Sequence, residues 1–378
     1  MEPLELVFWA AVGLLVYTHL GYPLLLLALS RLRRRDARLE VSPGAELPGV
    51  TLVVAAHDEE TVIGRWVASA LALDYPRDLL SVVVACDGCT DATADRARQA
   101  GADTVLELER GGKVAGLNAA VAGARTPVLA FADANSTWEP AALRLLIGAL
   151  GREGVGYVCG QVRFVAPEGT ANQEGLYWRY EMAVRELESE LGGITAGNGA
   201  INAVRREAYV ELEPTRGQDI SFPFELAKRG WRSSYEPRAL ASEPMAPTIQ
   251  GEFRRKRRMM AGAWNTILRT GLLSPRGYRP LYALEIYSHR LLRYATPILH
   301  LVALGANLAL LGEGAVYTAT LAAQLAFAAA ALLGGVLPLR PLLVARYYAA
   351  VTAASAAGLW DLLRHGVPRT WESVEGTR

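Results

Sequence analysis

The feature that most constrains this chain is a set of long apolar segments near its two ends. The first, residues 6–30, contains no Asp, Glu, Lys or Arg. A helix of this length, at about 1.5 Å per residue, is longer than the hydrocarbon core of a bilayer, which is about 30 Å thick. Residues 1–30 are therefore expected to form an N-terminal transmembrane anchor.

Charged residues next to this segment predict its orientation. The chain begins Met1-Glu2-Pro3, without the basic start of a cleaved signal peptide, and this favours an anchor that is retained. A predicted basic linker, residues 31–45, follows the anchor; its arginines are Arg31, Arg33, Arg34, Arg35 and Arg38. Because positive charge collects on the cytoplasmic side of membranes, we expect the linker to be cytoplasmic and the N-terminus to lie outside.

A second apolar region lies in the C-terminal third. Between residues 294 and 339 the only charged residue is Glu313, which lies in a Gly-Glu-Gly break. This break predicts two spans, 295–311 and 315–337, and a weaker third span at 342–363 carries Arg346 and Asp361. We expect a membrane region at 286–365 with about three transmembrane helices, then a tail at 366–378. Buried core helices of a soluble protein are the alternative.

The middle of the chain, residues 46–285, has the pattern of a globular α/β domain. Short β-branched runs alternate with segments of helical pattern, which predicts a parallel, doubly wound sheet that binds its ligand at the carboxyl ends of the strands. The predicted strands are 50–56, 80–85, 104–107 and 127–132, and the predicted helices are 59–73, 92–100 and 114–124.

Polar clusters follow three of these strands, at 58–59, 87–91 and 133–135. Neither a Gly-rich dinucleotide turn nor a phosphate-binding P-loop is present. Carboxylates at a phosphate-binding edge either face the phosphate through a divalent cation or bind the base and ribose. Asp133 and Asn135 offer two oxygen ligands for Mg²⁺ or Mn²⁺. Lys113 adds a cation nearby. The net charge of +1 gives no sign of a nucleic-acid partner, and the Cys86–Cys89 spacing stays open as a redox or zinc pair.

In combination, these residues resemble the membrane-bound family 2 glycosyltransferases, more narrowly the cellulose-synthase-like group. Six motifs that carry the resemblance occur in order, within about 45–300: Ala-Ala-His-Asp-Glu-Glu (55–60), Asp-Gly-Cys-Thr-Asp (87–91), Gly-Gly-Lys-x-x-Gly-Leu-Asn (111–118), Ala-Asp-Ala-Asn (132–135), Gly-Asn-Gly-Ala-Ile (197–201), and Gly-Gln-Asp-Ile (217–220) with Lys-Arg-Gly-Trp-Arg (228–232).

The resemblance implies a GT-A fold, which is Rossmann-like, and an inverting transfer of sugar from a UDP- or GDP-sugar to a lipid or glycan acceptor. By position it implies that Asp219 is the catalytic base. The other implied roles are nucleoside or donor contact for Ala56, Glu59 and Asp87, diphosphate contact for Lys113 and Arg258, and metal binding for Asp133 and Asn135. The product would be a cell-surface polysaccharide or glycolipid, made at the inner membrane by a cytoplasmic catalytic domain.

Two positions depart from the family's pattern. Asn135 stands where a second Asp is usual, so Asp133 carries more of the metal site. In the basic run 254–258 and beyond, Arg258 matches the family's Gln-x-x-Arg-Trp motif, whereas Arg255 and Met259 replace its Gln and Trp, which weakens the case for a processive polymerase.

Several alternatives stay open at this point. Asp219 could instead cap a helix over 222–229, and the basic run could be a solvated or lipid-facing strip. The whole chain could also be a polyprenyl-phosphate glycosyltransferase or an inactive glycan-binding scaffold subunit.

Overall fold

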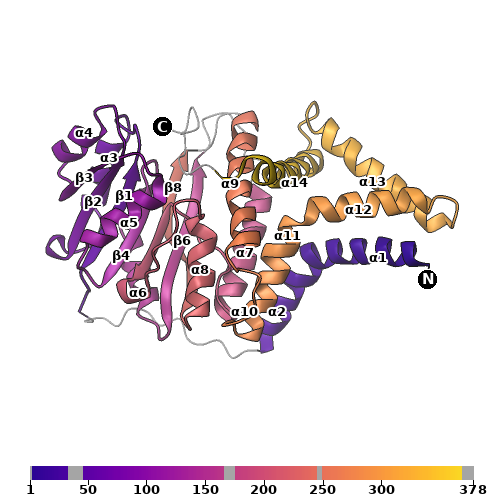
Figure 1. Ribbon diagram of the computed structural model, residues 1–378, viewed down its shortest axis with the longest axis horizontal. Helices are drawn as coiled ribbons and strands as arrows, with labels where there is room; N and C mark the ends of the chain where they lie inside the picture. Colours follow the sequence, from indigo (N-terminus) through magenta and orange to yellow (C-terminus); the bar gives the residue numbers. More distant parts are fainter. Residues whose placement is uncertain (1, 33–45, 166–174, 245–248, 368–378) are drawn as a thin grey trace.

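The computed structural model describes residues 2–32, 46–165, 175–244 and 249–367. Most of the predicted basic linker and of the tail lies outside these residues. One mixed sheet of eight strands forms the centre of the α/β domain, in the order β3-β2-β1-β4-β7-β6-β8-β5 (Figure 1). The strands are β1 (Val50–Ala56), β2 (Leu80–Asp87), β3 (Thr104–Leu108), β4 (Val128–Asp133), β5 (Thr137–Trp138), β6 (Val155–Val165), β7 (Ile201–Arg205) and β8 (Arg232–Pro244).

The first four strands confirm the predicted β/α alternation, because β1 pairs in parallel with both β2 and β4, and β2 pairs in parallel with β3. The prediction of a wholly parallel sheet was wrong. Strand β7 runs antiparallel to β4, with Ile201 opposite Ala132, and it enters the sheet where β4 ends. Its preceding turn, residues 197–200, therefore lies at the carboxyl edge of the parallel strands.

The helices of the α/β domain are α3 (Ile63–Leu71), α4 (Thr93–Gln99), α5 (Lys113–Gly123), α6 (Ala142–Leu150), α7 (Gly175–Leu191), α8 (Gln218–Lys228) and α9 (Ile249–Arg269), with short 3₁₀ turns η2 (Arg77–Leu79) and η3 (Arg206–Ala208). Helix α3 begins four residues later than predicted. Asp58 has a left-handed φ of 50°, and the Glu59 carbonyl accepts bonds from the N–H groups of Val62 and Ile63, so 59–62 form a turn first.

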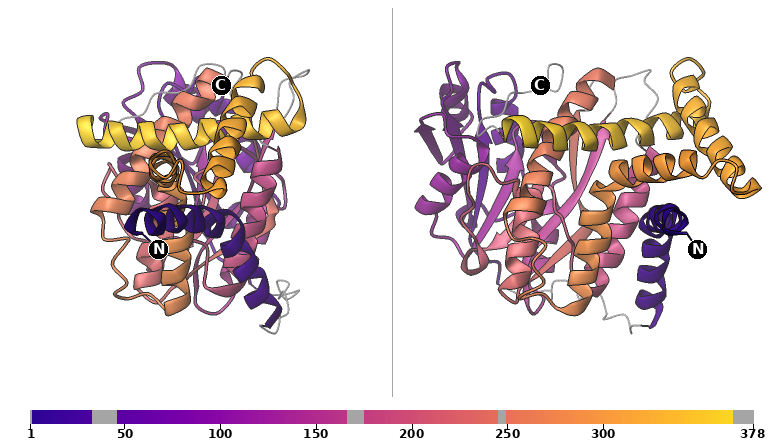
Figure 2. Two further views of the ribbon diagram at one scale, coloured as in Figure 1. Left: turned by 90° about the vertical axis from the view of Figure 1, so that its right-hand side faces the viewer. Right: turned by 45° about the vertical axis from the view of Figure 1, so that its right-hand side comes forward.

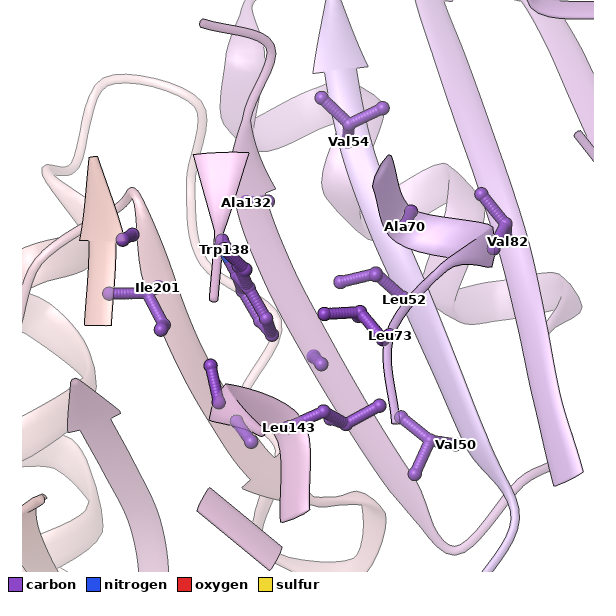
Figure 3. Packing of buried hydrophobic residues seen from close by; sticks show 14 of the residues in the cluster. Val50, Leu52, Val54, Ala70, Leu73, Val82, Ala132, Trp138, Leu143 and Ile201 are labelled. Atoms are coloured by element: carbon purple, nitrogen blue, oxygen red, sulfur yellow. The ribbon is translucent and has the colours of Figure 1, made fainter. Parts of the chain in front are cut away.

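Both faces of the sheet are buried, which explains why β1 is apolar at every position except Thr51. Alternate residues of β1, namely Val50, Leu52 and Val54, point into one core with Trp138 and Leu143 (Figure 3). The residues between them point into a second core on the opposite face, which includes Val53, Ala55, Leu117, Phe131 and Phe222.

The apolar ends of the chain form helices that lie beside the α/β domain (Figures 1 and 2). They are α1 (Pro3–Val16), the π-helical η1 (Tyr17–Gly21), α2 (Tyr22–Leu32), α10 (Pro280–Glu285), the π-helical η4 (Ile286–Leu291), α11 (Leu292–Tyr294), α12 (Thr296–Ala309), α13 (Ala315–Leu333) and α14 (Arg340–His365). Helix α1 packs against α12 through Phe8, Ala306 and Leu310.

Three helices of the described residues are long and apolar enough to cross a membrane: Pro3–Leu32, Ala315–Leu333 and Arg340–His365. A fourth candidate is a broken span, in which Pro280–Tyr294 and Thr296–Ala309 meet at a bend of 63°. The predicted spans at the N-terminus, at 315–337 and at 342–363 thus correspond to helices. The one predicted at 295–311 is only the second part of the bent pair.

Candidate active site

The loop between β3 and α5 is fastened to the end of β2 by Asp87. This side chain is 1% exposed, and its Oδ1 accepts hydrogen bonds from the N–H groups of Gly111 at 2.6 Å and Gly112 at 3.0 Å. Arg110 lies 3.8 Å from its Oδ2. The carboxylate predicted to contact the nucleoside therefore also fixes the loop that leads to Lys113.

The ends of β1 and β2 are joined by two further bonds. His57, directly after Ala56, lies with Nδ1 2.8 Å from the Asp87 carbonyl oxygen. Thr93 Oγ1 accepts a bond of 2.8 Å from the Glu59 N–H group, and Glu59 itself is 2% exposed. Ala56, Glu59 and Asp87 are thus brought to one edge of the sheet, as predicted.

Gly199 is the point at which three predicted site residues meet. A Cβ atom at residue 199 would lie 2.7 Å from Lys113 Nζ, 3.4 Å from Asp133 Oδ2 and 3.4 Å from Asp219 Oδ1. Lys113 also forms a direct ion pair with Asp133 Oδ1. Residues from α5, β4 and α8, up to 106 positions apart, therefore share one small space that only a residue without a side chain leaves open.

Each of these side chains is positioned by a short element. Lys113 is the first residue of α5, and Asp133 is the last residue of β4. Asp219 lies in the first turn of α8, whose N-cap is Gly217. Asp219 is therefore not the N-cap of this helix, which was its alternative role. Its backbone carbonyl accepts a bond of 2.8 Å from Gly197 N–H, which holds the Gly199 turn against the helix.

The site is acidic and partly buried, and both properties shift the pKa values of Asp219 and Lys113. Burial raises the pKa of Asp219, and the neighbouring Asp133 carboxylate raises it further, whereas Lys113 lowers it. For Lys113, burial lowers the pKa, but the Asp133 and Asp219 carboxylates outweigh it and the net shift is upward. Lys113 therefore stays charged among the carboxylates.

Glu243, near the end of β8, is a site residue that the sequence reasoning missed. Burial, and then the Asp133 charge, raise its pKa to about 7, while Arg255 and Lys113 act in the opposite direction. The only sequence signal is a single Glu in Ser-Glu-Pro, which nothing nearby marks as a site. Arg185 on α7 is a second such residue, since its guanidinium acts on Asp219.

The basic run on α9 has several partners. Arg255 is the member that acts on Glu243, and its guanidinium lies 5.5 Å from the centre of the Phe164 ring. Arg257 binds Asp361 of α14 through two bonds of 2.6 Å. Arg258, the predicted diphosphate contact, is exposed on the same helix.

The donor set at this edge suits a divalent cation. Asp133 and Asn135 present oxygen atoms from one loop, which are the ligands that Mg²⁺ and Mn²⁺ prefer. The residues present therefore fit the metal that the sequence motif implies.

A family model described as "Glycosyltransferase like family 2" matches residues 48–262. This range is more than half of the chain and includes every residue of the edge described above. The chain belongs to glycosyltransferase family 2. It is therefore a glycosyltransferase with a GT-A type α/β domain, accompanied by helices that can span a membrane.

Two curated relatives illustrate the range of the similarity. The chain is 29% identical over 248 residues to a beta-monoglucosyldiacylglycerol synthase of Nostoc sp., covering 60% of this chain and 51% of the relative. It is 23% identical over 254 residues to a poly-beta-1,6-N-acetyl-D-glucosamine synthase of Staphylococcus aureus, covering 63% and 60%. The chain thus spans little more than half the length of the curated relatives it matches.

One solved structure is similar in fold to this chain along nearly its whole length. This is the mannosyltransferase PcManGT from Pyrobaculum calidifontis, in complex with GDP-Man and Mn²⁺, with a TM-score of 0.73 and 22% identity. The match covers 96% of this chain and 99% of the other. The similarity therefore includes the membrane-side helices as well as the sheet.

Proposed function

We propose that this glycosyltransferase moves a sugar from a nucleoside diphosphate sugar to a membrane-associated acceptor, with inversion at the anomeric carbon and with a divalent metal. The observation that carries the proposal is the meeting of Lys113, Asp133 and Asp219 around Gly199. It provides a place for a metal, a cation for a leaving diphosphate and a carboxylate for an acceptor, all within one space.

The donor side of the reaction is assigned to the β1, β2 and β4 edge. Ala56, Glu59 and Asp87 would line the nucleoside. Asp133, with Asn135, would hold Mg²⁺ or Mn²⁺, which supplies positive charge to the diphosphate oxygens as the bond to the sugar breaks. Lys113 would add a second positive charge there. Arg258 on α9 would add a third where the diphosphate extends to that helix. Consistent with this donor class, PcManGT was solved with GDP-Man and Mn²⁺.

The acceptor side is assigned to Asp219. Its carboxylate would accept the proton of the attacking hydroxyl while the new oxygen–carbon bond forms and the bond from the anomeric carbon to the diphosphate breaks. The nucleoside diphosphate leaves with the electron pair of that bond, so no oxidant or covalent nucleophile is required. Burial raises the pKa of Asp219, which makes the carboxylate a stronger base than an exposed one.

The acceptor is assigned to the membrane because apolar helices lie beside the catalytic domain. Relatives of this chain include a synthase of a glycolipid and a synthase of a polysaccharide, and both products are candidates here. In the proposed topology the catalytic domain is cytoplasmic at the inner membrane and the N-terminus lies outside. A reporter fused after residue 40 that is active only outside the membrane would reverse this topology.

A donor screen tests the proposal. Protein purified in detergent is incubated with a panel of UDP- and GDP-sugars, with Mn²⁺ or Mg²⁺, and release of the nucleoside diphosphate is measured. We expect release from one donor or a small group of donors, loss of that release in EDTA, and recovery when metal is added back. Equal turnover in EDTA would remove the metal from the mechanism.

A further inference from the structure

A cavity of about 90 Å³ lies where the membrane-side helices meet the catalytic domain. It is far larger than the roughly 10–15 Å³ that one water molecule needs. Its lining includes His19, Glu181, Arg290, Arg293, Tyr348 and Thr352. These residues come from η1, α7, η4, α11 and α14, so the cavity is closed only when the two parts of the chain are packed together.

The position of this cavity is at the domain-side ends of the apolar helices. Helix α1 ends at Val16, just before the segment that carries His19. Helix α12 begins at Thr296, which also lines the cavity. From there α1 and α12 extend side by side away from the sheet (Figures 1 and 2). A membrane that contains these two helices has its headgroup layer at the level of the cavity.

Two guanidinium groups in the wall supply the chemistry. Arg290 is 8% exposed, and it donates from Nε to Thr195 Oγ1 at 2.8 Å and contacts His289 through Nη2 at 3.3 Å. Its Nη1 has no hydrogen-bond partner among the described residues. Arg293 pairs with Glu181 and lies 5.2 Å from the centre of the Tyr180 ring. The lining therefore contains two Arg and one carboxylate, with the buried Glu188 behind His289, and it offers an unused donor.

The local backbone is a second, independent sign of a binding site. Arg290 lies in the π-helical segment η4 and His19 in the π-helical segment η1. Single π-helical turns inside α-helices are rare and occur frequently at functional sites. Here two of them face the same cavity from chain positions more than 260 residues apart.

We propose that this cavity binds the anionic phosphate headgroup of a membrane phospholipid. Arginine matches phosphate oxygens through its planar set of N–H donors, and basic pockets between membrane helices on the domain side favour anionic headgroups. The bound lipid connects η1 and α14 to α7 and so holds the catalytic domain against the membrane. This inference does not rest on the proposed sugar transfer, since the site is separate and its readout is lipid binding.

Native mass spectrometry tests the inference on the full chain. Delipidated protein in a mild detergent is incubated with phosphatidylglycerol, phosphatidylcholine or inorganic phosphate. We expect one phosphatidylglycerol to be retained per chain, with much less phosphatidylcholine. Because hydrogen bonds to charged groups are strong, Arg290→Gln should lower retention by about tenfold or more.

A second variant keeps the test valid if Arg290→Gln does not fold. Thr352→Phe fills the cavity and leaves every charge in place, and it should lower retention to a similar extent. Arg276→Gln is the matched control, since Arg276 is exposed and lies outside the lining, and it should retain lipid as the wild type does.

Three results would overturn the inference. Equal retention by wild type and Thr352→Phe would place the lipid elsewhere. Equal retention of the two phospholipids would show that charge is not recognised. Displacement of phosphatidylglycerol by an equal concentration of inorganic phosphate would show a site for the free anion and not for a lipid.

Discussion

Replacing Gly199 by Ala perturbs the proposed active site with the smallest possible change. The new Cβ would lie 2.7 Å from Lys113 Nζ, whereas ordinary van der Waals contacts begin at 3.4 Å. The ammonium group must therefore move by about 0.7 Å or more, away from its place beside Asp133 and Asp219. The far end of a lysine moves easily, so the fold should tolerate the change.

Catalysis should be far more sensitive than stability. A displacement of about 1 Å at a catalytic centre costs on the order of 100-fold in rate, and we expect a loss of that size in nucleoside diphosphate release by Gly199→Ala. The melting temperature should change little, because the far end of Lys113 can move aside, and the loss of unfolding free energy should stay at about 1 kcal/mol, the centre of the distribution for single substitutions.

Gly64→Ala is the matched control. A Cβ at residue 64 meets nothing within 4 Å, and Gly64 lies inside helix α3, where Ala is expected to stabilise by about 0.4–1 kcal/mol. Its activity should equal that of the wild type. A loss of about 100-fold leaves about a hundredth of wild-type turnover. The reasoning is refuted if Gly199→Ala keeps more than about a tenth of it.

Three further changes give separate outcomes. Asp219→Asn should lower transfer by about 10²–10⁴-fold with donor affinity unchanged, because an amide cannot accept the proton; equilibrium donor titration and initial rates distinguish this from a binding defect. Asp87→Asn should cost about 1–3 kcal/mol in thermal unfolding, since the buried carboxylate holds two backbone N–H groups. Because the pKa of Glu243 is raised to about 7, the folded chain binds this proton more tightly than the unfolded chain. The melting temperature in EDTA should therefore fall as pH rises from about 4.5 through about 7, and Glu243→Gln should fall less.

The sequence predicts the first half of the sheet well because its strands are short apolar runs that each end at a polar group. Strands β1, β2 and β4 are apolar at nearly every position, and the polar groups that follow them, Asp87 and Asp133, lie at the ligand edge for reasons of topology alone. Lys113 and Asp219 lie near Asp133 at this edge as well, and in the sequence only their motifs indicate it.

Strand β8 shows why the second half is harder to predict. It carries Ser233, Ser234 and Glu236, all of which are buried, so its sequence has no apolar run. Two of these residues have side-chain partners: Ser234 bonds to Ser189 of α7 at 3.1 Å, and Glu236 pairs with Arg238 of the same strand and with Arg152. Contacts of this kind appear only after folding, and Glu243, on the same strand, was missed for the same reason.

The irregular segments of the membrane-side helices are also hard to predict from the sequence. The segment 6–30 has no charged residue, and its hydropathy predicts one continuous helix and not the π-helical turn Tyr17–Gly21 that separates α1 from α2. Likewise, Pro297 at the start of α12 indicates that a helix begins there, but it does not predict the bend of 63° before Thr296. The cavity between these two irregular segments was therefore not predictable from the chain alone.

The central claim is that a sugar leaves a nucleotide donor and reaches a membrane-associated acceptor at the centre formed by Lys113, Asp133 and Asp219. Its most direct test supplies the active donor with a radiolabelled sugar to protein in vesicles of native membrane lipid, and then measures label in the lipid-extractable and glycan fractions. The account predicts metal-dependent label in one fraction with wild-type protein and almost none with Asp219→Asn. No label in either fraction from a folded wild-type enzyme, or equal label with the variant, would contradict it.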